Sequence, residues 1–237
     1  MPPQETGFLI RTVNVHGTPY PYSVYVPRNF DRARKWPVVL FLHGAGERGT
    51  DGLRGTQIGA AATIRHEPEL VPAIVVFPQA PVDTRWIGEP ADAAMTALEH
   101  SIVEFHGDRT HTYLTGLSMG GYGTIHLALA NPKRFAALVV VCGGLLPHPS
   151  TISVQRSPLI PIDVDPYTFV GQSLRNVPIW LFHGADDTVV PADESRRLFD
   201  AIKQNPDAHY TEYPGVGHNA WDKAYADADM WKWLFSR

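Results

Sequence analysis

A serine between glycines, a pair of aspartates and a histidine are the residues of this chain best suited to covalent chemistry. Ser118 lies in "TGLSMGGYGT". The spacing Gly116-x-Ser118-x-Gly120 fits a nucleophile elbow, a strained turn that presents a serine between a strand and a helix. A serine hydroxyl is weakly nucleophilic at neutral pH, so it needs a neighbouring base, and the base needs an orienting acid. The pattern therefore predicts acyl-transfer chemistry if the rest of the chain supplies both groups.

Both partners follow Ser118 in the order Ser, then Asp or Glu, then His that accompanies this elbow. "LFHGADDTVVP" places Asp186 and Asp187 just after an apolar run, and "YPGVGHNAW" places His218 after another. The simpler alternatives are a helix N-cap for Asp187 and a solvated loop histidine for His218. Because the order and the strand-end positions agree, we expect Ser118, His218 and one of the aspartates to meet at one edge of a sheet.

Backbone donors for a developing oxyanion can also be located. Met119, the residue after Ser118, is expected to supply one N–H group. The loop "HGAG" after an earlier strand is expected to supply the second, through Ala45 or its alternative Gly46. A glycine-rich loop can instead bind phosphate, but the following "GERGTDG" lacks the lysine that such loops carry. The sequence thus predicts an oxyanion hole rather than a nucleotide site.

The elements that would position these residues alternate along the chain. Five short apolar runs are typical of strands buried on both faces: Trp36–Gly44, Ala73–Gln79, Thr110–Gly116, Phe135–Gly144 and Val177–Gly184. Phe8–Val15 and Tyr20–Val26 alternate as an antiparallel pair, and 208–213 is a further strand. Pro90–His106 has helical spacing, with Gly107 expected to end the helix. The alternation predicts an α/β fold with a mostly parallel sheet covered by helices on both faces.

Two stretches are expected to be long loops at the strand ends, Gly44–Thr56 and Leu145–Phe169, because neither has a steady period. Ligands of open α/β sheets bind outside the carboxyl ends of the strands, so these loops would build a site. Trp86 and Trp221 lie in segments near that edge and are candidate walls of a substrate pocket, with core packing as the alternative.

Composition narrows the classes of partner. At 237 residues, we expect one catalytic domain over residues 1–237, which is allowed to be a fragment of a longer protein. The net charge of −4 offers no basic surface for nucleic acid. The single cysteine, Cys142, excludes an internal disulfide and a Cys-based zinc site. His100, His106 and His111 lack the HExxH pairing, so we expect neither a metal nor another cofactor.

Targeting signals are not evident. No apolar run reaches 18 residues, so no membrane span is expected, and "MPPQETGFLI" lacks the features of a signal peptide. Compartment and oligomeric state are left open by the sequence.

Four segments taken together carry a resemblance: "FLHGAGERG", "GLSMGGYGT", "HGADDTVVP" and "GVGHNAW". They resemble the α/β-hydrolase superfamily of serine esterases, in the branch near predicted-peptidase, polyhydroxybutyrate-depolymerase and feruloyl-esterase-like proteins, from about residue 20 to the C-terminus. The resemblance implies an eight-stranded, mostly parallel sheet, with Ser118 as nucleophile and His218 as base. It also implies Asp187 as the acid, because that residue occupies the family's place four residues before Pro191 in the run D-x-V-V-P.

The expected function is therefore a serine carboxylesterase that hydrolyses short-chain esters, small or polymer-linked, through an acyl-enzyme. The alternatives are a serine peptidase or amidase of the same fold, and a feruloyl or acetyl-xylan type of esterase. A binding protein that has lost its chemistry would lack a triad member, and none is missing. No large lid insertion like that of lipases is found, which disfavours long-chain lipid substrates.

Overall fold

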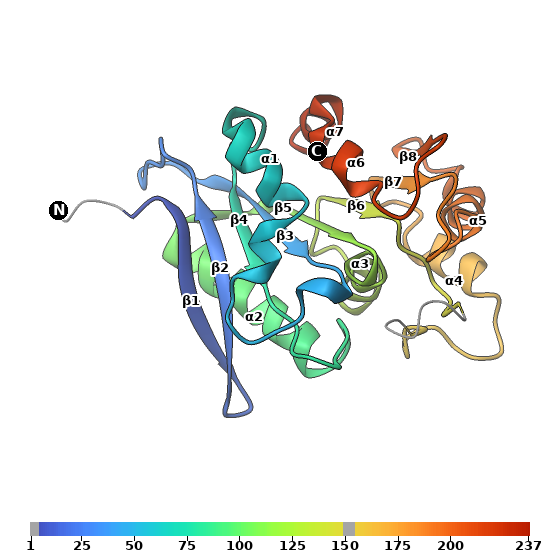
Figure 1. Cartoon of the computed structure of the whole chain (residues 1–237), viewed down its shortest axis with the longest axis horizontal. Coiled ribbons are helices and arrows are strands. Elements are labelled where there is room, and N and C mark those ends of the chain that lie inside the picture. Colours follow the sequence, from blue (N-terminus) through green and yellow to red (C-terminus); the bar gives the residue numbers. More distant parts are fainter. Residues whose placement is uncertain (1–4, 149–154) are drawn as a thin grey trace.

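The computed structural model describes residues 5–148 and 155–237. Its centre is one eight-stranded sheet in the spatial order β1-β2-β4-β3-β5-β6-β7-β8 (Figure 1). β1 pairs antiparallel with β2 and β2 antiparallel with β4, while every other neighbouring pair is parallel. The strands are β1 Gly7–Val15, β2 Thr18–Val26, β3 Trp36–Leu42, β4 Ile74–Pro78, β5 Gly107–Leu117, β6 Ala137–Val141, β7 Ile179–Gly184 and β8 Ala208–Tyr213. The mostly parallel sheet expected from the sequence is confirmed.

Helices cover both faces of the sheet, because the central strands are apolar on both sides. On β3, Val38, Leu40 and Leu42 pack into one buried cluster, and Val39 and Phe41 pack into the other. The first cluster is completed by α2 Glu89–Glu104, α3 Met119–Ala130, α4 Pro166–Ser173 and α5 Asp193–Ile202. The second is completed by α1 Ala60–His66, α6 Trp221–Ala226 and α7 Ala228–Leu234.

One helix boundary was predicted for the wrong reason. α2 ends at Glu104, and Gly107 opens β5 instead of ending the helix. A Cβ on Gly107 would lie 2.5 Å from the Val38 side chain and 3.1 Å from Ile102 Cα. The glycine is therefore needed for the close approach of helix and strand, which a helix-end pattern does not reveal.

Part of the predicted loop Leu145–Phe169 is helical. α4 begins at Pro166, and the Asp165 side chain caps it by accepting a hydrogen bond from the Thr168 N–H. The prolines of this stretch interrupt the apolar period on which the prediction depended. No helix in the described ranges is long and apolar enough to cross a membrane.

Candidate active site

Ser118 occupies a sharp turn between β5 and α3 with backbone angles φ 52° and ψ −119°. A positive φ is costly for a residue with a Cβ, so the surroundings must hold it. A Cβ on Gly120 would lie 1.9 Å from the Leu42 carbonyl oxygen, and one on Gly116 would lie 2.3 Å from the Gly120 oxygen. The two glycines of the elbow are thus required by close backbone approach. The Ser118 N–H donates to the Val141 oxygen at 2.9 Å and ties the turn to β6.

Three of the predicted site residues come together at the carboxyl edge of the sheet. Ser118 Oγ lies 2.8 Å from His218 Nε2, and His218 Nδ1 lies 2.7 Å from Asp187 Oδ2. A carboxylate can only accept, so Nδ1 carries the proton and Nε2 accepts from the serine hydroxyl. Asp186, the other candidate acid, is exposed and does not take this place.

The Asp187 side chain is fully buried and yet held ionised. Burial by itself would raise its pKa, but hydrogen bonds from His183 and His218 outweigh that effect and hold the pKa well below its ordinary value. The N–H groups of Val189 and Val190 donate to Oδ1 at 2.8 and 2.9 Å. The carboxylate is therefore fixed in orientation as well as in charge.

The backbone groups predicted for the oxyanion lie at the starts of two helices. Met119 is the first residue of α3, and Ala45 is the first residue of the 3-10 helix Ala45–Glu47. The first N–H groups of a helix have no intrahelical acceptor and carry the positive end of the helix dipole. The Ala45 loop also runs beside the serine, because a Cβ on Gly44 would lie 3.7 Å from Ser118 Cβ.

His43 supports the loop that contains Ala45 through hydrogen bonds. It is fully buried. The Ala80 N–H donates to its Nε2 at 3.0 Å, so Nδ1 carries the proton and donates to the Gly44 oxygen at 2.6 Å. Burial lowers the pKa of His43 to about 4, which keeps the ring neutral.

Gln79 fastens the same loop from the end of β4. Its side-chain amide donates to the Glu47 oxygen at 3.0 Å and accepts from the Gly52 N–H at 2.6 Å. The neighbouring Glu47 carboxyl has its pKa raised by burial. These contacts give the glycine-rich loop one conformation beside Ser118.

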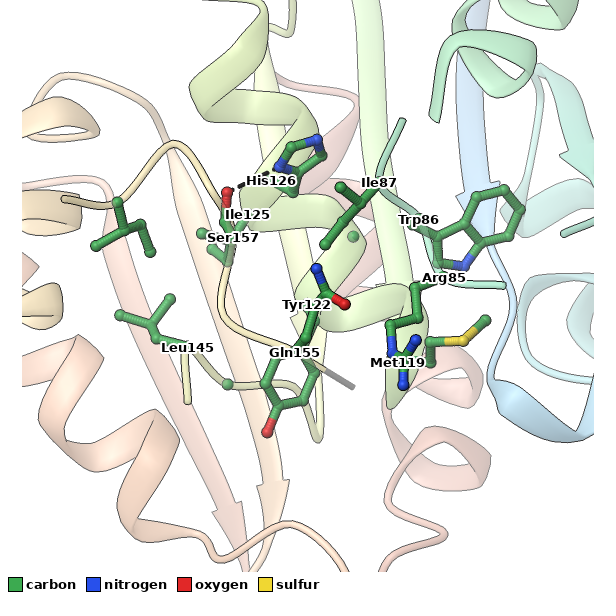
Figure 2. Close-up of a pocket in the computed structure, with 13 residues that line it drawn as sticks. Arg85, Trp86, Ile87, Met119, Tyr122, Ile125, His126, Leu145, Gln155 and Ser157 are labelled. Atoms are coloured by element: carbon green, nitrogen blue, oxygen red, sulfur yellow. Dashed lines mark hydrogen bonds between the residues drawn. The ribbon is translucent and has the colours of Figure 1, made fainter. Parts of the chain in front are cut away.

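The two predicted pocket tryptophans lie on different sides of the site. Trp86 is 1% exposed, and its indole N–H donates to the His43 oxygen at 3.0 Å. Trp221 is half-buried at the start of α6 and packs edge-on against the His218 ring at a centroid distance of 5.3 Å. A cavity of about 20 Å³ lies on the Trp86 side (Figure 2), and another cavity lies between Trp221 and residues of α1.

Sequence reasoning missed His183. This fully buried residue lies on β7, with Nε2 3.2 Å from Asp187 Oδ2. The available signal was a repeated ending: β3 runs into His43-Gly44 and β7 into His183-Gly184. The histidines singled out for a metal lie elsewhere, and His111 pairs with Asp108 at 2.9 Å. Within residues 5–148 and 155–237, no three His, Cys, Asp or Glu side chains gather as metal ligands would.

Comparisons with known proteins find an esterase family and several similar proteins. A family model described as "Putative esterase" matches residues 14–235. The chain is 24% identical over 197 residues to "Probable feruloyl esterase C" of Aspergillus terreus, covering 81% of this chain and 63% of the relative. It is 28% identical over 171 residues to "Acetyl esterase" of Caldicellulosiruptor saccharolyticus, covering 62% of this chain and 63% of that one.

A solved structure described as a thermostable esterase is similar along most of the chain. It superposes with a TM-score of 0.79 at 30% identity, covering 97% of this chain and 62% of the other. The chain therefore spans less than two thirds of the length of each of these three relatives.

Proposed function

This chain belongs to the esterase family whose model it matches and has the α/β-hydrolase fold, and from that membership we propose that it is a serine carboxylesterase. Ser118 is the nucleophile, His218 the base and Asp187 the orienting acid. The observation that carries the proposal is the continuous hydrogen-bonded line from Ser118 Oγ through His218 to Asp187, with distances of 2.8 and 2.7 Å. The single sheet supports one catalytic domain over residues 1–237.

Acylation follows from the protonation states of the three side chains. As Ser118 Oγ bonds to the ester carbon, its proton passes to His218 Nε2. Asp187 stays ionised, holds the imidazole tautomer and stabilises the imidazolium. The carbonyl π electrons move to oxygen, where the N–H groups of Ala45 and Met119 donate to the developing charge. Losing one such donor typically costs about 10²–10³ in turnover.

Collapse of the tetrahedral intermediate breaks the bond to the alcohol oxygen. His218 returns its proton to that oxygen, the alcohol leaves, and Ser118 keeps the acyl group. A water molecule then takes the alcohol's place, gives a proton to His218 Nε2 and attacks the acyl carbon. The carboxylic acid departs as Ser118 recovers its proton. Both halves use the same histidine, so a single misplaced ring would stop both.

The esters to be assayed are chosen from the relatives, which are named as a feruloyl and an acetyl esterase. We propose carboxylic esters of that size, attached to a small alcohol or to a polymer. The same triad can cleave amides, so each ester is assayed beside its matching anilide. Faster hydrolysis of the anilide than of the ester would replace the esterase proposal by an amidase.

The direct test is Ser118→Ala with p-nitrophenyl acetate. We expect turnover to fall by about 10⁶-fold, as when the nucleophile of a triad is removed. Labelling with a fluorophosphonate should add one phosphonyl group to the peptide containing Ser118. Ser173→Ala is the control, since that exposed hydroxyl only donates to the Phe169 oxygen. Full activity in Ser118→Ala would exclude the proposed mechanism.

A further inference from the structure

A narrow cavity runs along one face of α3, starting at Met119, the residue that follows the proposed nucleophile (Figure 2). Met119, Tyr122, Gly123 and His126 line it from the helix, and this spacing places them on a single face. At 1.5 Å per residue, the lining residues from Met119 to His126 span about 10 Å of the helix. The cavity itself is small: its volume is about 20 Å³, room for about one water-sized or methyl-sized group.

The remaining walls are mostly apolar. Trp86, Ile125, Leu145 and Ile160 line the cavity, and each is at most 2% exposed. Arg85 lies at the Met119 end, Gln155 and Ser157 add two polar side chains, and no carboxylate occurs among the described residues of the lining. The walls therefore suit a small apolar group better than a charged or hydrated one.

The reaction itself decides which half of an ester this cavity can hold. His218 Nε2 must reach the alcohol oxygen to protonate it, so the alcohol departs on the side of His218. The acyl group is bonded to the same carbon and extends away from His218. The described lining residues come from the loop after β4, from α3, from Gly144 and Leu145, and from residues 155–160, and none of them belongs to the His218 loop.

We propose that this cavity is the acyl pocket and that it takes a short apolar acyl group. The proposal rests on the proposed function of Ser118. The depth of the cavity is set by side chains that are held in place by their neighbours. Trp86 is held between His43 and Gly123, where a Cβ on Gly123 would lie 2.5 Å from Trp86 Cβ.

The opposite wall is fixed through its backbone. The N–H groups of Leu145 and Leu146 donate to the Glu194 carboxylate at 2.7 and 3.2 Å. The Tyr122 hydroxyl donates to the Leu146 oxygen at 3.0 Å. The Leu145 side chain can therefore be changed in size while these main-chain contacts persist.

The experiment changes the size of that side chain and measures two substrate series. One series joins p-nitrophenol to acyl groups from acetate to octanoate, and the other joins acetate to alcohols of increasing size. In Leu145→Ala, we expect the hexanoate-to-acetate ratio of kcat/KM to rise by at least about tenfold, since one methylene in a tight pocket is worth about 10–200-fold. Leu145→Phe should lower the butyrate-to-acetate ratio by about tenfold.

Controls separate the pocket from general loss of packing. Leu198→Ala removes the same atoms from a buried site on α5, outside the cavity, and should leave both series unchanged in profile. Ile160→Ala widens a different wall and should shift the acyl series in the same direction as Leu145→Ala.

Several outcomes would overturn the acyl-pocket proposal. A shift in the alcohol series would assign the cavity to the leaving group, and unchanged profiles in both folded variants would exclude it as a subsite. Preference for a succinate half-ester over butyrate would contradict its apolar character. Each of these leaves the Ser118→Ala result intact, whereas an enzyme inactive on every ester would instead refute the proposed function.

His183 carries a second inference from independent contacts. Its Nε2 lies 2.9 Å from the Val190 oxygen and 3.2 Å from Asp187 Oδ2, and its Nδ1 lies 2.7 Å from Ser195 Oγ. The Val190 carbonyl can only accept, so Nε2 carries the proton and Nδ1 accepts from Ser195. The one N–H group therefore donates to the Val190 carbonyl, and the same nitrogen lies 3.2 Å from the Asp187 carboxylate.

We infer that His183 is a positioning residue for Asp187. Oδ2 of that carboxylate receives His218 Nδ1 on one side and His183 Nε2 on the other. A neutral donor in this place keeps Asp187 ionised and stops the carboxylate from turning away from His218. The inference also rests on the proposed function, because it assigns a task within that triad.

The test compares His183→Leu with His183→Gln. Leucine removes both hydrogen bonds, whereas the glutamine amide retains a donor and an acceptor. For Leu, we expect kcat per titrated active site to fall by about 10–100-fold, the scale seen when the partner of a metal-bound histidine is lost. KM should be unchanged because His183 does not line the cavity. Gln should recover most of the loss.

A spectroscopic readout distinguishes positioning from stability. In the proton NMR spectrum of the parent enzyme, the proton on His218 Nδ1 should give a strongly downfield resonance. This resonance should move upfield in His183→Leu. A purely structural role predicts a smaller burst amplitude with normal kcat per active site and an unmoved resonance, which would overturn the inference. If His183→Leu does not fold, His183→Phe keeps a ring without the N–H group, and an unchanged kcat per active site with an unmoved resonance in that variant would overturn the inference as well.

Discussion

Two strand ends, one on each side of Ser118, carry the same dipeptide and use it in opposite ways. His43-Gly44 follows β3, and His183-Gly184 ends β7. Both imidazoles are fully buried. His43 has its proton on Nδ1, because Nε2 accepts from a backbone N–H, and His183 has its proton on Nε2, because that nitrogen faces a carbonyl. The tautomer is thus set by the neighbouring backbone and not by the local sequence.

The difference separates two tasks of one site. His43 shapes the backbone loop that contains Ala45, so it supports the proposed oxyanion hole. His183 contacts the Asp187 carboxylate, so it supports the proposed acid of the triad. The glycines differ too: a Cβ on Gly184 would meet the Gly217 oxygen at 2.2 Å, but one on Gly44 would meet the tip of the Leu117 side chain at 2.9 Å.

The largest expected effect comes from changing Asp187, the proposed acid that follows β7. In Asp187→Asn, the amide cannot accept from both histidines with the charge that holds the His218 tautomer, and kcat should fall by about 10⁴-fold. Asp186→Asn is the matched control, because its exposed side chain lies outside the triad. Steady-state kinetics on p-nitrophenyl acetate check both. Similar losses in the two variants would contradict the choice of Asp187.

The two glycines are then compared directly. Gly184→Ala should displace the backbone that leads to His218 and lower kcat by about 10²-fold, the cost typical of a 1 Å misplacement. Gly44→Ala should cost less, because a flexible side-chain end can move aside. Turnover of the two purified variants measures the difference. Equal losses would show that the two strand ends tolerate crowding alike.

The buried neutral ring on the β3 side predicts a pH-dependent stability. The unfolded chain protonates His43 below about pH 6.5, but the folded chain does so only near pH 4. The unfolded state therefore binds more protons between these values, and the free energy of unfolding falls as the pH is lowered from about 6.5 to 4. The contribution is about 2–3 kcal/mol at pH 4.5.

Urea unfolding at pH 7.5 and pH 4.5 measures this contribution as a difference between variants. His43→Gln should lose less of its stability between the two pH values than the parent does. The exposed His66 provides the control, and His66→Gln should keep the parent's dependence. A parent-like dependence in His43→Gln would show that the ring is not the source.

The smallest expected effect comes from removing one hydrogen bond, the one that the His43 carbonyl accepts. Trp86→Phe keeps an aromatic ring but deletes the N–H that donates to the His43 oxygen. A buried acceptor left without its donor costs about 1–3 kcal/mol, so the urea midpoint should fall modestly. Turnover should change by less than about tenfold if the oxyanion loop stays in place. A larger loss of turnover would show that this loop had moved.

Much of the fold could be predicted because its signals are local. Apolar runs marked the central strands, and the elbow around Ser118 could be recognised from glycines two residues away on either side. The predictions failed where a residue serves a distant contact. Gly107 resembled a helix end but makes room for Val38. The only local signal at His183 was the His-Gly ending that β7 shares with β3, and its neighbour Asp187 comes close only when the chain turns after β7.

The sequence by itself determined the strands, the helices and the strained turn of Ser118, since apolar period and glycine spacing act over a few residues. It also determined the order of the three reactive groups. Only the tertiary structure decided which nitrogen of each buried histidine carries the proton and which residues line the cavity along α3. These features depend on contacts between residues as much as 100 positions apart, and a local sequence pattern cannot predict such contacts.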